Sequence, residues 1–256
     1  MRINGMKVLL IDNSKADLCE FTRLLEKWLQ SNVEEVVCCD DIDDIVTNLN
    51  EKEYDAAILS GSSINLSEPN RLEYVRKSIS TILRLHTPIL GICFGMQLIA
   101  SSYGGFVKRL DYQVKEESKI QVLNSVLMNT GDISIKVTCS HQDYVSKLPP
   151  DFKICSMHKN CIYMFESIKF LRFGVQFHPE CKVDGESVCV LHNFFKFVLE
   201  RSSLPIYIPD ELWVDVICNL PKKRVRHFLN ILSIDEILHI WHNHRKIWNM
   251  PSIMIS

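Results

Sequence analysis

The stretch Thr87–Gly105, "TPILGICFGMQLIASSYGG", sets a buried-looking apolar run directly before a cysteine that has a glycine two residues away on each side. Small residues at a bend between a strand and a helix are typical of a nucleophile elbow, in which the side chain at the apex is exposed above a sheet. Gly91 and Gly95 are expected to permit a strained backbone and close packing of the helix. The N-terminus of that helix favours a thiolate. The pattern therefore predicts a strand at 88–92, a helix after it, and a reactive Cys93 between them.

The chain around this stretch alternates short apolar runs with helical repeats. Strands are expected at 7–12, 33–39, 54–61 and 88–92, and helices at 15–30, 40–50 and 71–86. Residues 106–177 hold several short β-like runs, and a closing helix is expected at 186–200. Strands that alternate with helices form parallel βαβ units. The predicted fold class is therefore α/β, with a doubly wound, mostly parallel sheet.

The composition narrows the classes of function. A net charge of −2 gives no electrostatic case for binding nucleic acid or an anionic membrane surface. No apolar run approaches the roughly 18 residues of a membrane-spanning helix. None of the ten cysteines belongs to a C-x-x-C pair, so no metal site is expected. Because we see no secretory signal, we expect reduced thiols and a cytoplasmic location.

A thiol nucleophile needs a base, and the base needs a group that orients it. The segment 170–180, "FLRFGVQFHPE", supplies both, because a β-like run leads into His178 and Glu180 follows. An imidazole can take the thiol proton, and a carboxylate on its other nitrogen fixes the tautomer. Ligand sites in parallel α/β sheets lie outside the carboxyl ends of the strands. We therefore expect Cys93, His178 and Glu180 to meet at that edge.

The motifs "GICFGMQ" and "FGVQFHPE" resemble the class I (triad-type) glutamine amidotransferase family, and the closest likeness is to the glutaminase domain of GMP synthase. The segments "AAILSGSS" and "SHQDYV" support the resemblance, which covers roughly residues 6–200. It implies a flavodoxin-like fold and hydrolysis of the side-chain amide of L-glutamine through a cysteine thioester. The resemblance also implies that Cys93 is the nucleophile, that His178 shuttles protons and that Glu180 orients His178. No cofactor is expected.

The resemblance also assigns supporting residues. It places the oxyanion hole at Gly61, Ser62 and the backbone amide of Phe94, and contacts with glutamine at Gln97, Gln142 and Asp143. Two departures from the family pattern matter. The family usually has Ser-Gly-Gly-Pro where this chain has Ser60–Ser63, so the Ser62 side chain restricts a peptide that should point into the oxyanion hole. The second departure is "YQVKEESK" in place of an Arg-Glu-Tyr/Phe-Gly element, which weakens the GMP assignment and leaves the three catalytic candidates unaffected.

The predicted domain organisation is an amidotransferase domain at 1–200 and a helical extension at 201–256 that weakly resembles the opening of an F-box. No glycine-rich phosphate motif follows residue 200, so a fused ATP-binding domain is not expected. One interpretation is a free-standing glutaminase that supplies ammonia to a separate synthetase. The alternatives are a stand-alone γ-glutamyl hydrolase or peptidase, and a non-catalytic interaction protein on an amidotransferase scaffold.

Overall fold

The computed structural model describes residues 3–14, 20–39, 54–67, 82–83, 85, 87–128, 132–182 and 184–201. The chain divides into two compact units, 1–206 and 207–256, and every described residue belongs to the first. The helix expected at 40–50, most of the one expected at 71–86, and all but the first residue of the extension at 201–256 lie outside the described residues.

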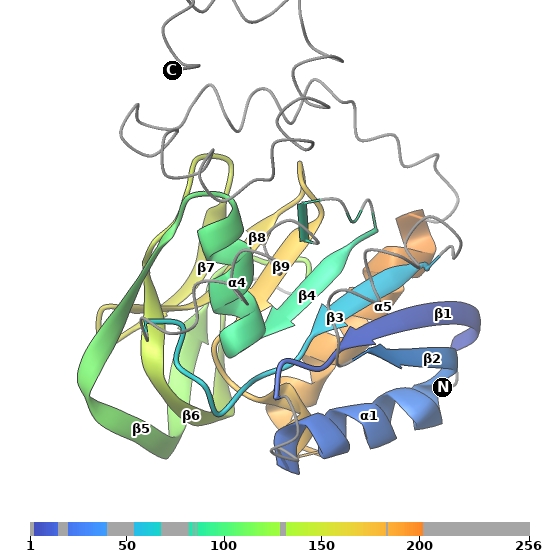
Figure 1. Ribbon diagram of the computed structural model, residues 1–256, viewed down its shortest axis with the longest axis horizontal. Helices are drawn as coiled ribbons and strands as arrows, with labels where there is room; N and C mark the ends of the chain where they lie inside the picture. The colour runs from blue at the N-terminus through green and yellow to red at the C-terminus, as the bar shows by residue number, and fades with distance from the viewer. Residues whose placement is uncertain are drawn as a thin grey trace, which may run out of the picture. The chain divides into compact units, whose positions relative to one another are not determined.

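The described residues form one nine-stranded sheet in the order β2-β1-β3-β4-β9-β8-β6-β5, with β7 paired to β8 (Figure 1). Its strands are β1 (Ile3–Ile11), β2 (Val33–Cys39), β3 (Ala56–Leu59), β4 (Ile89–Ile92), β5 (Phe106–Val122), β6 (Ile133–Lys147), β7 (Lys153–His158), β8 (Cys161–Ser167) and β9 (Arg172–Val175). The pairs from β2 through β9 are parallel, and those that join β9, β8, β7, β6 and β5 are antiparallel. The α/β class with a doubly wound sheet is confirmed.

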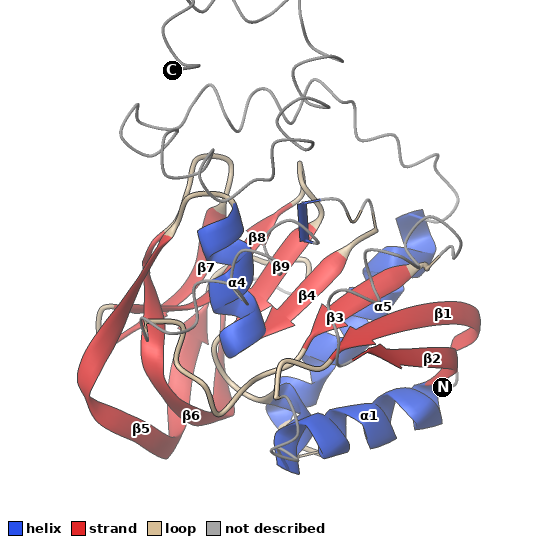
Figure 2. Cartoon of the chain, viewed as in Figure 1, coloured by secondary structure: helices blue, strands red, loops and turns tan. Residues whose placement is uncertain are grey.

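The helices cover both faces of this sheet (Figure 2). They are α1 (Glu20–Asn32), α4 (Phe94–Ser102) and α5 (Cys189–Arg201), with the 3-10 turns η2 (Pro179–Cys181) and η3 (Glu186–Val188) before α5. Figure 1 shows α4 on one side of the parallel strands and α5 on the other. The doubly wound arrangement leaves the carboxyl ends of β3, β4 and β9 side by side at one edge.

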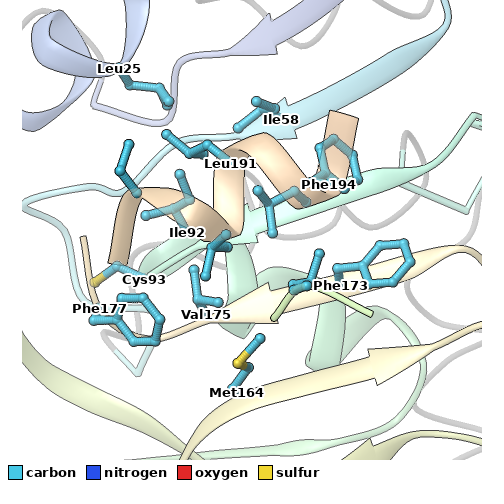
Figure 3. Close-up of a cluster of buried hydrophobic side chains, with 14 of the residues drawn as sticks. Leu25, Ile58, Ile92, Cys93, Met164, Phe173, Val175, Phe177, Leu191 and Phe194 are labelled. Atoms are coloured by element: carbon cyan, nitrogen blue, oxygen red, sulfur yellow. The ribbon is translucent and has the colours of Figure 1, made fainter. Parts of the chain in front are cut away.

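Side chains that alternate along the parallel strands build the core beneath α5. Figure 3 shows Ile58, Ile92 and Val175 of three neighbouring strands turned toward Leu191 and Phe194 of α5. All five side chains are fully buried. Burying a side chain of this size stabilises the fold by about 1.5–3 kcal/mol, so this layer holds β3, β4 and β9 in fixed register.

The glycines of the elbow serve close packing rather than backbone freedom. A Cβ added to Gly91 would lie 2.5 Å from the Gly95 carbonyl carbon, and one added to Gly95 would lie 2.4 Å from the Leu59 carbonyl oxygen. Of the described glycines, only Gly104 has a positive φ. The expected close packing of the helix is therefore confirmed, and the strained residue at the bend is Cys93 itself, with a φ of 51°.

The antiparallel half departs most from the expectations. The sequence predicts short runs at 106–110, 120–127 and 133–139, which β5 and β6 exceed, and it predicts no run over β7. Most side chains of β5 are exposed, and its second half, "VKEESKIQV", mixes charged and apolar residues. A strand with one face in water has no continuous apolar run, which is why it was missed.

The contact between Gly95 and Leu59 gives a test of the packing. Gly95→Ala should lower the free energy of unfolding by about 1–3 kcal/mol, because its Cβ meets a strand backbone that cannot move aside. The helix propensity of alanine offsets only about 1 kcal/mol of such strain. Urea denaturation measures the change. Ser101→Ala, half-buried on the same helix, is the control and should change stability by about 0.5 kcal/mol or less. A Gly95→Ala protein as stable as the parent would contradict this account.

Candidate active site

Three segments far apart in the sequence meet at the carboxyl edge of the parallel strands. Gly61 follows β3, Cys93 follows β4, and His178 follows β9. A Cβ added to Gly61 would lie 2.9 Å from His178 Cε1 and 3.7 Å from Cys93 Cβ. The predicted meeting of these segments is therefore present, and the space between them is just wide enough for a glycine.

Cys93 occupies the apex between β4 and α4. Its φ of 51° and ψ of −105° are rarely adopted by residues other than glycine, and such a conformation costs about 1–3 kcal/mol. Its N–H donates to the Val175 carbonyl oxygen at 2.7 Å, and its carbonyl oxygen accepts from the Gln97 N–H at 3.2 Å. The sulfur lies 3.6 Å from the Ser140 carbonyl oxygen. A strained backbone around a buried thiol is a reason to assign it a function.

His178 and Glu180 form a buried pair. His178 Nδ1 lies 2.8 Å from Glu180 Oε1, and the two side chains are 2% and 1% exposed. The pair spans only two residues because η2, which begins at Pro179, turns the chain back. Burial by itself lowers the pKa of His178, but the Glu180 carboxylate and the neighbouring Cys93 together raise that pKa well above its usual range. The ring is therefore suited to hold a proton beside the thiol.

The other nitrogen of this imidazole, Nε2, is available for proton transfer. His178 Nε2 is buried, and no hydrogen-bond partner for it is present among the described residues. Leaving a buried polar atom unpaired normally costs about 1–3 kcal/mol. Because Nδ1 is engaged by Glu180, Nε2 is the nitrogen left to exchange a proton with the Cys93 thiol or with a substrate.

Sequence reasoning missed the contribution of α1 to this site. The Phe21 ring stacks on the His178 imidazole, with centroids 4.0 Å apart and planes 23° from parallel. Cations are attracted to the face of an aromatic ring, so this contact favours the protonated imidazole as well as fixing its plane. In the sequence Phe21 is only one member of a helical apolar repeat. Nothing local distinguishes it, because its partner is far away along the chain.

A second histidine, His141 on β6, also lies near the site. Its Nδ1 is 3.1 Å from the Asp143 carbonyl oxygen, and its Nε2 is 3.4 Å from the Tyr163 hydroxyl. Burial lowers the pKa of His141 to about 4, so it stays neutral at physiological pH. Among the described residues, His141 has no carboxylate partner comparable with Glu180, which favours His178 as the base.

Of the three predicted glutamine-contacting residues, Gln97 and Asp143 take part in a buried network and Gln142 does not. Gln97 is 2% exposed, and its Nε2 donates to the Asp143 carbonyl oxygen at 2.8 Å and to Gln176 Oε1 at 3.3 Å. The Asp143 carboxylate accepts from the N–H and the hydroxyl of Ser67, both at 2.8 Å. Gln142 turns toward β5, where its Oε1 accepts from Arg109 Nη2 at 2.7 Å. Contacts of these residues with glutamine stay predictions.

The predicted oxyanion segment is fixed at its start. The Ser60 hydroxyl accepts from the Asn13 backbone N–H at 2.9 Å, and the Ser60 carbonyl oxygen accepts from Asn13 Nδ2 at 2.8 Å. The Ser60 hydroxyl also lies 2.9 Å from the Gly61 carbonyl oxygen. Ser62 Oγ accepts from the Ile64 N–H at 3.1 Å, which closes a small turn. Two side-chain contacts therefore hold the peptide between Gly61 and Ser62, while Phe94 begins α4 next to Cys93.

The described residues contain no cluster of three His, Cys, Asp or Glu side chains that could hold a metal ion. Among the same residues, no helix has the length and apolar character needed to cross a membrane.

The His178–Glu180 pair gives a prediction for titration. In Glu180→Gln the carboxylate that raises the pKa of His178 is gone, so burial should pull that pKa down, toward or below the ordinary value of about 6.5. At about pH 8, His178 should be protonated in the parent protein and neutral in the variant. NMR of labelled imidazoles measures both titrations. His192 on α5, whose pKa is lowered by burial, is the internal control and should not change. An unchanged His178 titration would show that Glu180 is not what holds the proton.

Comparison with known proteins identifies the family of the chain. The profile of the family "Glutamine amidotransferase class-I" matches residues 11–198. A GMP synthase (glutamine-hydrolysing) of Petrotoga mobilis is 32% identical over 74% of this chain, and the match covers 36% of that protein's length. One subunit of the glutamine-hydrolysing GMP synthase of Methanothermobacter thermautotrophicus is 29% identical over 74% of this chain and 97% of its own length. The chain thus spans about a third of the Petrotoga protein and nearly all of the Methanothermobacter one.

Solved structures share the fold. A candidate GMP synthase subunit of Thermoplasma acidophilum superposes with a TM-score of 0.64 at 22% identity, over 78% of this chain and 96% of that one. A glutamine amidotransferase of Thermotoga maritima superposes with a TM-score of 0.53 at 19% identity, over 88% of this chain and 94% of its own. With the profile matching most of the sequence, the chain belongs to the class I glutamine amidotransferase family.

Proposed function

We propose that this chain hydrolyses the side-chain amide of L-glutamine and delivers the ammonia to a separate synthetase that makes GMP or a related product. The observation that carries the proposal is the buried His178–Glu180 pair, 2.8 Å apart, beside a thiol on a strained strand-to-helix bend. A scaffold that served only to bind a partner would gain nothing from keeping this costly arrangement.

In the proposed first half-reaction, the Cys93 thiolate attacks the amide carbon of glutamine and His178 carries the thiol proton. The C–N bond then breaks, His178 gives its proton to the leaving nitrogen, and ammonia departs. A thioester to Cys93 remains. Glu180 keeps the imidazole in one tautomer and stabilises its positive charge. General acid–base help of this kind is worth roughly 10²–10⁴-fold in rate.

In the second half-reaction, water replaces ammonia. His178 Nε2 takes a proton from the water molecule while the water oxygen attacks the thioester carbon. The C–S bond then breaks, which gives glutamate and regenerates Cys93. Both tetrahedral intermediates carry negative charge on the former amide oxygen. The Phe94 amide and the peptide between Gly61 and Ser62 are the proposed donors to that oxygen.

The separate partner is proposed from the Methanothermobacter relative. That protein matches this chain over 97% of its own length and is named as one subunit of a glutamine-hydrolysing GMP synthase. Ammonia made without a partner would be lost to solvent, which favours a complex over a stand-alone hydrolase. A cytoplasmic location follows from this role and remains part of the proposal.

Replacing the nucleophile tests the proposal directly. Cys93→Ala should reduce ammonia release from glutamine by roughly 10⁴–10⁶-fold without changing the circular dichroism spectrum, because no other group is proposed to form the thioester. A diazoketone analogue of glutamine should label the parent protein once, at Cys93, as read by peptide mass spectrometry. Cys189→Ala, a half-buried thiol on α5, is the control and should label and turn over like the parent.

Three results would redirect the proposal. Labelling at Cys139 or Cys181 instead would reject Cys93 as nucleophile. Turnover of γ-glutamyl peptides in preference to glutamine would indicate the hydrolase alternative. No turnover of either substrate, with or without a candidate GMP-forming synthetase, would leave the interaction protein as the better interpretation.

The oxyanion segment gives a second test. The Ser62 side chain holds a local turn through Ile64, so we expect the isolated chain to be a slow glutaminase whose oxyanion hole is completed by the partner. Ser62→Gly should raise basal turnover toward the roughly 10²–10³-fold that one oxyanion donor is worth. Steady-state ammonia release measures it, with Ser63→Gly, an exposed neighbour, as the control. Full turnover of the unmodified chain without a partner would contradict this expectation.

A further inference from the structure

Gln176 lies between the end of β9 and His178, and its side chain is fully buried. Its Nε2 is 3.5 Å from Cys93 Sγ, within hydrogen-bonding distance of a sulfur acceptor. Its own backbone N–H donates to the Tyr163 carbonyl oxygen at 2.9 Å, which fixes where the side chain starts. The Gln176 side chain therefore contacts the sulfur atom of the proposed nucleophile, Cys93.

The neighbours of Gln176 determine which end of its amide faces the sulfur. Its Oε1 accepts from Gln97 Nε2 at 3.3 Å, and that same Gln97 Nε2 donates to the Asp143 backbone carbonyl at 2.8 Å. A backbone carbonyl can only accept a hydrogen bond, so the Asp143 carbonyl fixes the orientation of the Gln97 amide, with its NH₂ group toward Asp143 and Gln176. If Gln176 were turned over, two NH₂ groups would face each other. The network therefore presents an N–H of Gln176, and not its oxygen, to Cys93.

A donor at this position affects the two forms of the cysteine differently. The neutral thiol can donate to the Ser140 carbonyl oxygen, 3.6 Å away, but a thiolate can only accept. A hydrogen bond to the charged form of a group stabilises that form. In the described part of the chain, the titratable groups near Cys93 include His178, whose charge acts in the same direction. Cys139 and His141 are kept neutral by burial, which raises the pKa of Cys139 to about 11 and lowers that of His141 to about 4.

From this geometry we propose that Gln176 donates a hydrogen bond to the Cys93 sulfur, which stabilises the thiolate and holds it for attack, and that Gln97 acts as a positioning residue by orienting Gln176. The inference rests on the proposed nucleophilic role of Cys93. It adds a fourth side chain to the set formed by Cys93, His178 and Glu180.

The test measures the thiolate without using glutamine. Alkylation of Cys93 by iodoacetamide is followed against pH by peptide mass spectrometry, and the midpoint of the profile reports thiolate formation. Gln176→Met keeps the length of the side chain but has no N–H, so the midpoint should rise by about one pH unit and alkylation at neutral pH should slow about tenfold. Gln176→Glu places a carboxylate beside the sulfur and should raise the midpoint further.

Two further variants define the specificity of the effect. Gln97→Met should raise the midpoint by less than Gln176→Met, because it only frees the Gln176 amide to turn. Gln121→Met, an exposed glutamine on β5, should leave the profile unchanged. Circular dichroism checks that each variant is folded. If Gln176→Met does not fold, the nearly isosteric Gln176→Glu takes its place in the test.

An unchanged midpoint in folded Gln176→Met or Gln176→Glu would overturn the inference, as would a midpoint that falls in Gln176→Glu. Neither result would bear on whether glutamine is the substrate. Conversely, a parent protein that turned over no glutamine, with or without a candidate synthetase, would reject the proposed function, while the alkylation profiles would still report the contact between Gln176 and Cys93.

Discussion

One backbone hydrogen bond joins the two halves of the site, from the Cys93 N–H to the Val175 carbonyl oxygen at 2.7 Å. It continues the parallel pairing of β4 with β9 by one step, to the point where both strands end. Cys93 then leaves into α4, while β9 leads into Gln176 and His178. Because the two segments diverge from a shared hydrogen bond, the thiol, the amide and the imidazole start from backbone positions that cannot drift apart.

The opposite end of the same strand pair is fixed in a different way. The buried guanidinium of Arg172, the first residue of β9, donates to the backbone carbonyls of Thr87 and Ile82, in the segment that leads into β4. Charge-assisted hydrogen bonds to carbonyls are strong, and those of the two terminal nitrogens offset the burial of the charge, although Nε has no partner among the described residues. The strand pair is therefore held at both ends, and the apolar layer beneath α5 packs against one face of it. This rigidity compensates for a strained Cys93 and for the buried His178 Nε2.

The parts of the fold that the sequence predicts well are those where local pattern and burial coincide. β3 and β4 are short, fully buried apolar runs, and the elbow carries its own glycine signal, so both strands and the residue at the bend could be placed. The full lengths of β5 and β6 could not, because one of their faces is in water. The roles of Gln176 and Phe21 could not be predicted for another reason, because each side chain acts through a partner that only the folded chain brings near.

The segment after β3 is anchored at two points, by Asn13 on Ser60 and by the Asp143 carboxylate on Ser67. Between these anchors the chain must cover a set distance with a set number of residues. An insertion or deletion within this span would therefore pull one anchor out of place, whatever residues the span contains. The length of this span is thus a constraint on the site in addition to the close approach of Gly61 to His178.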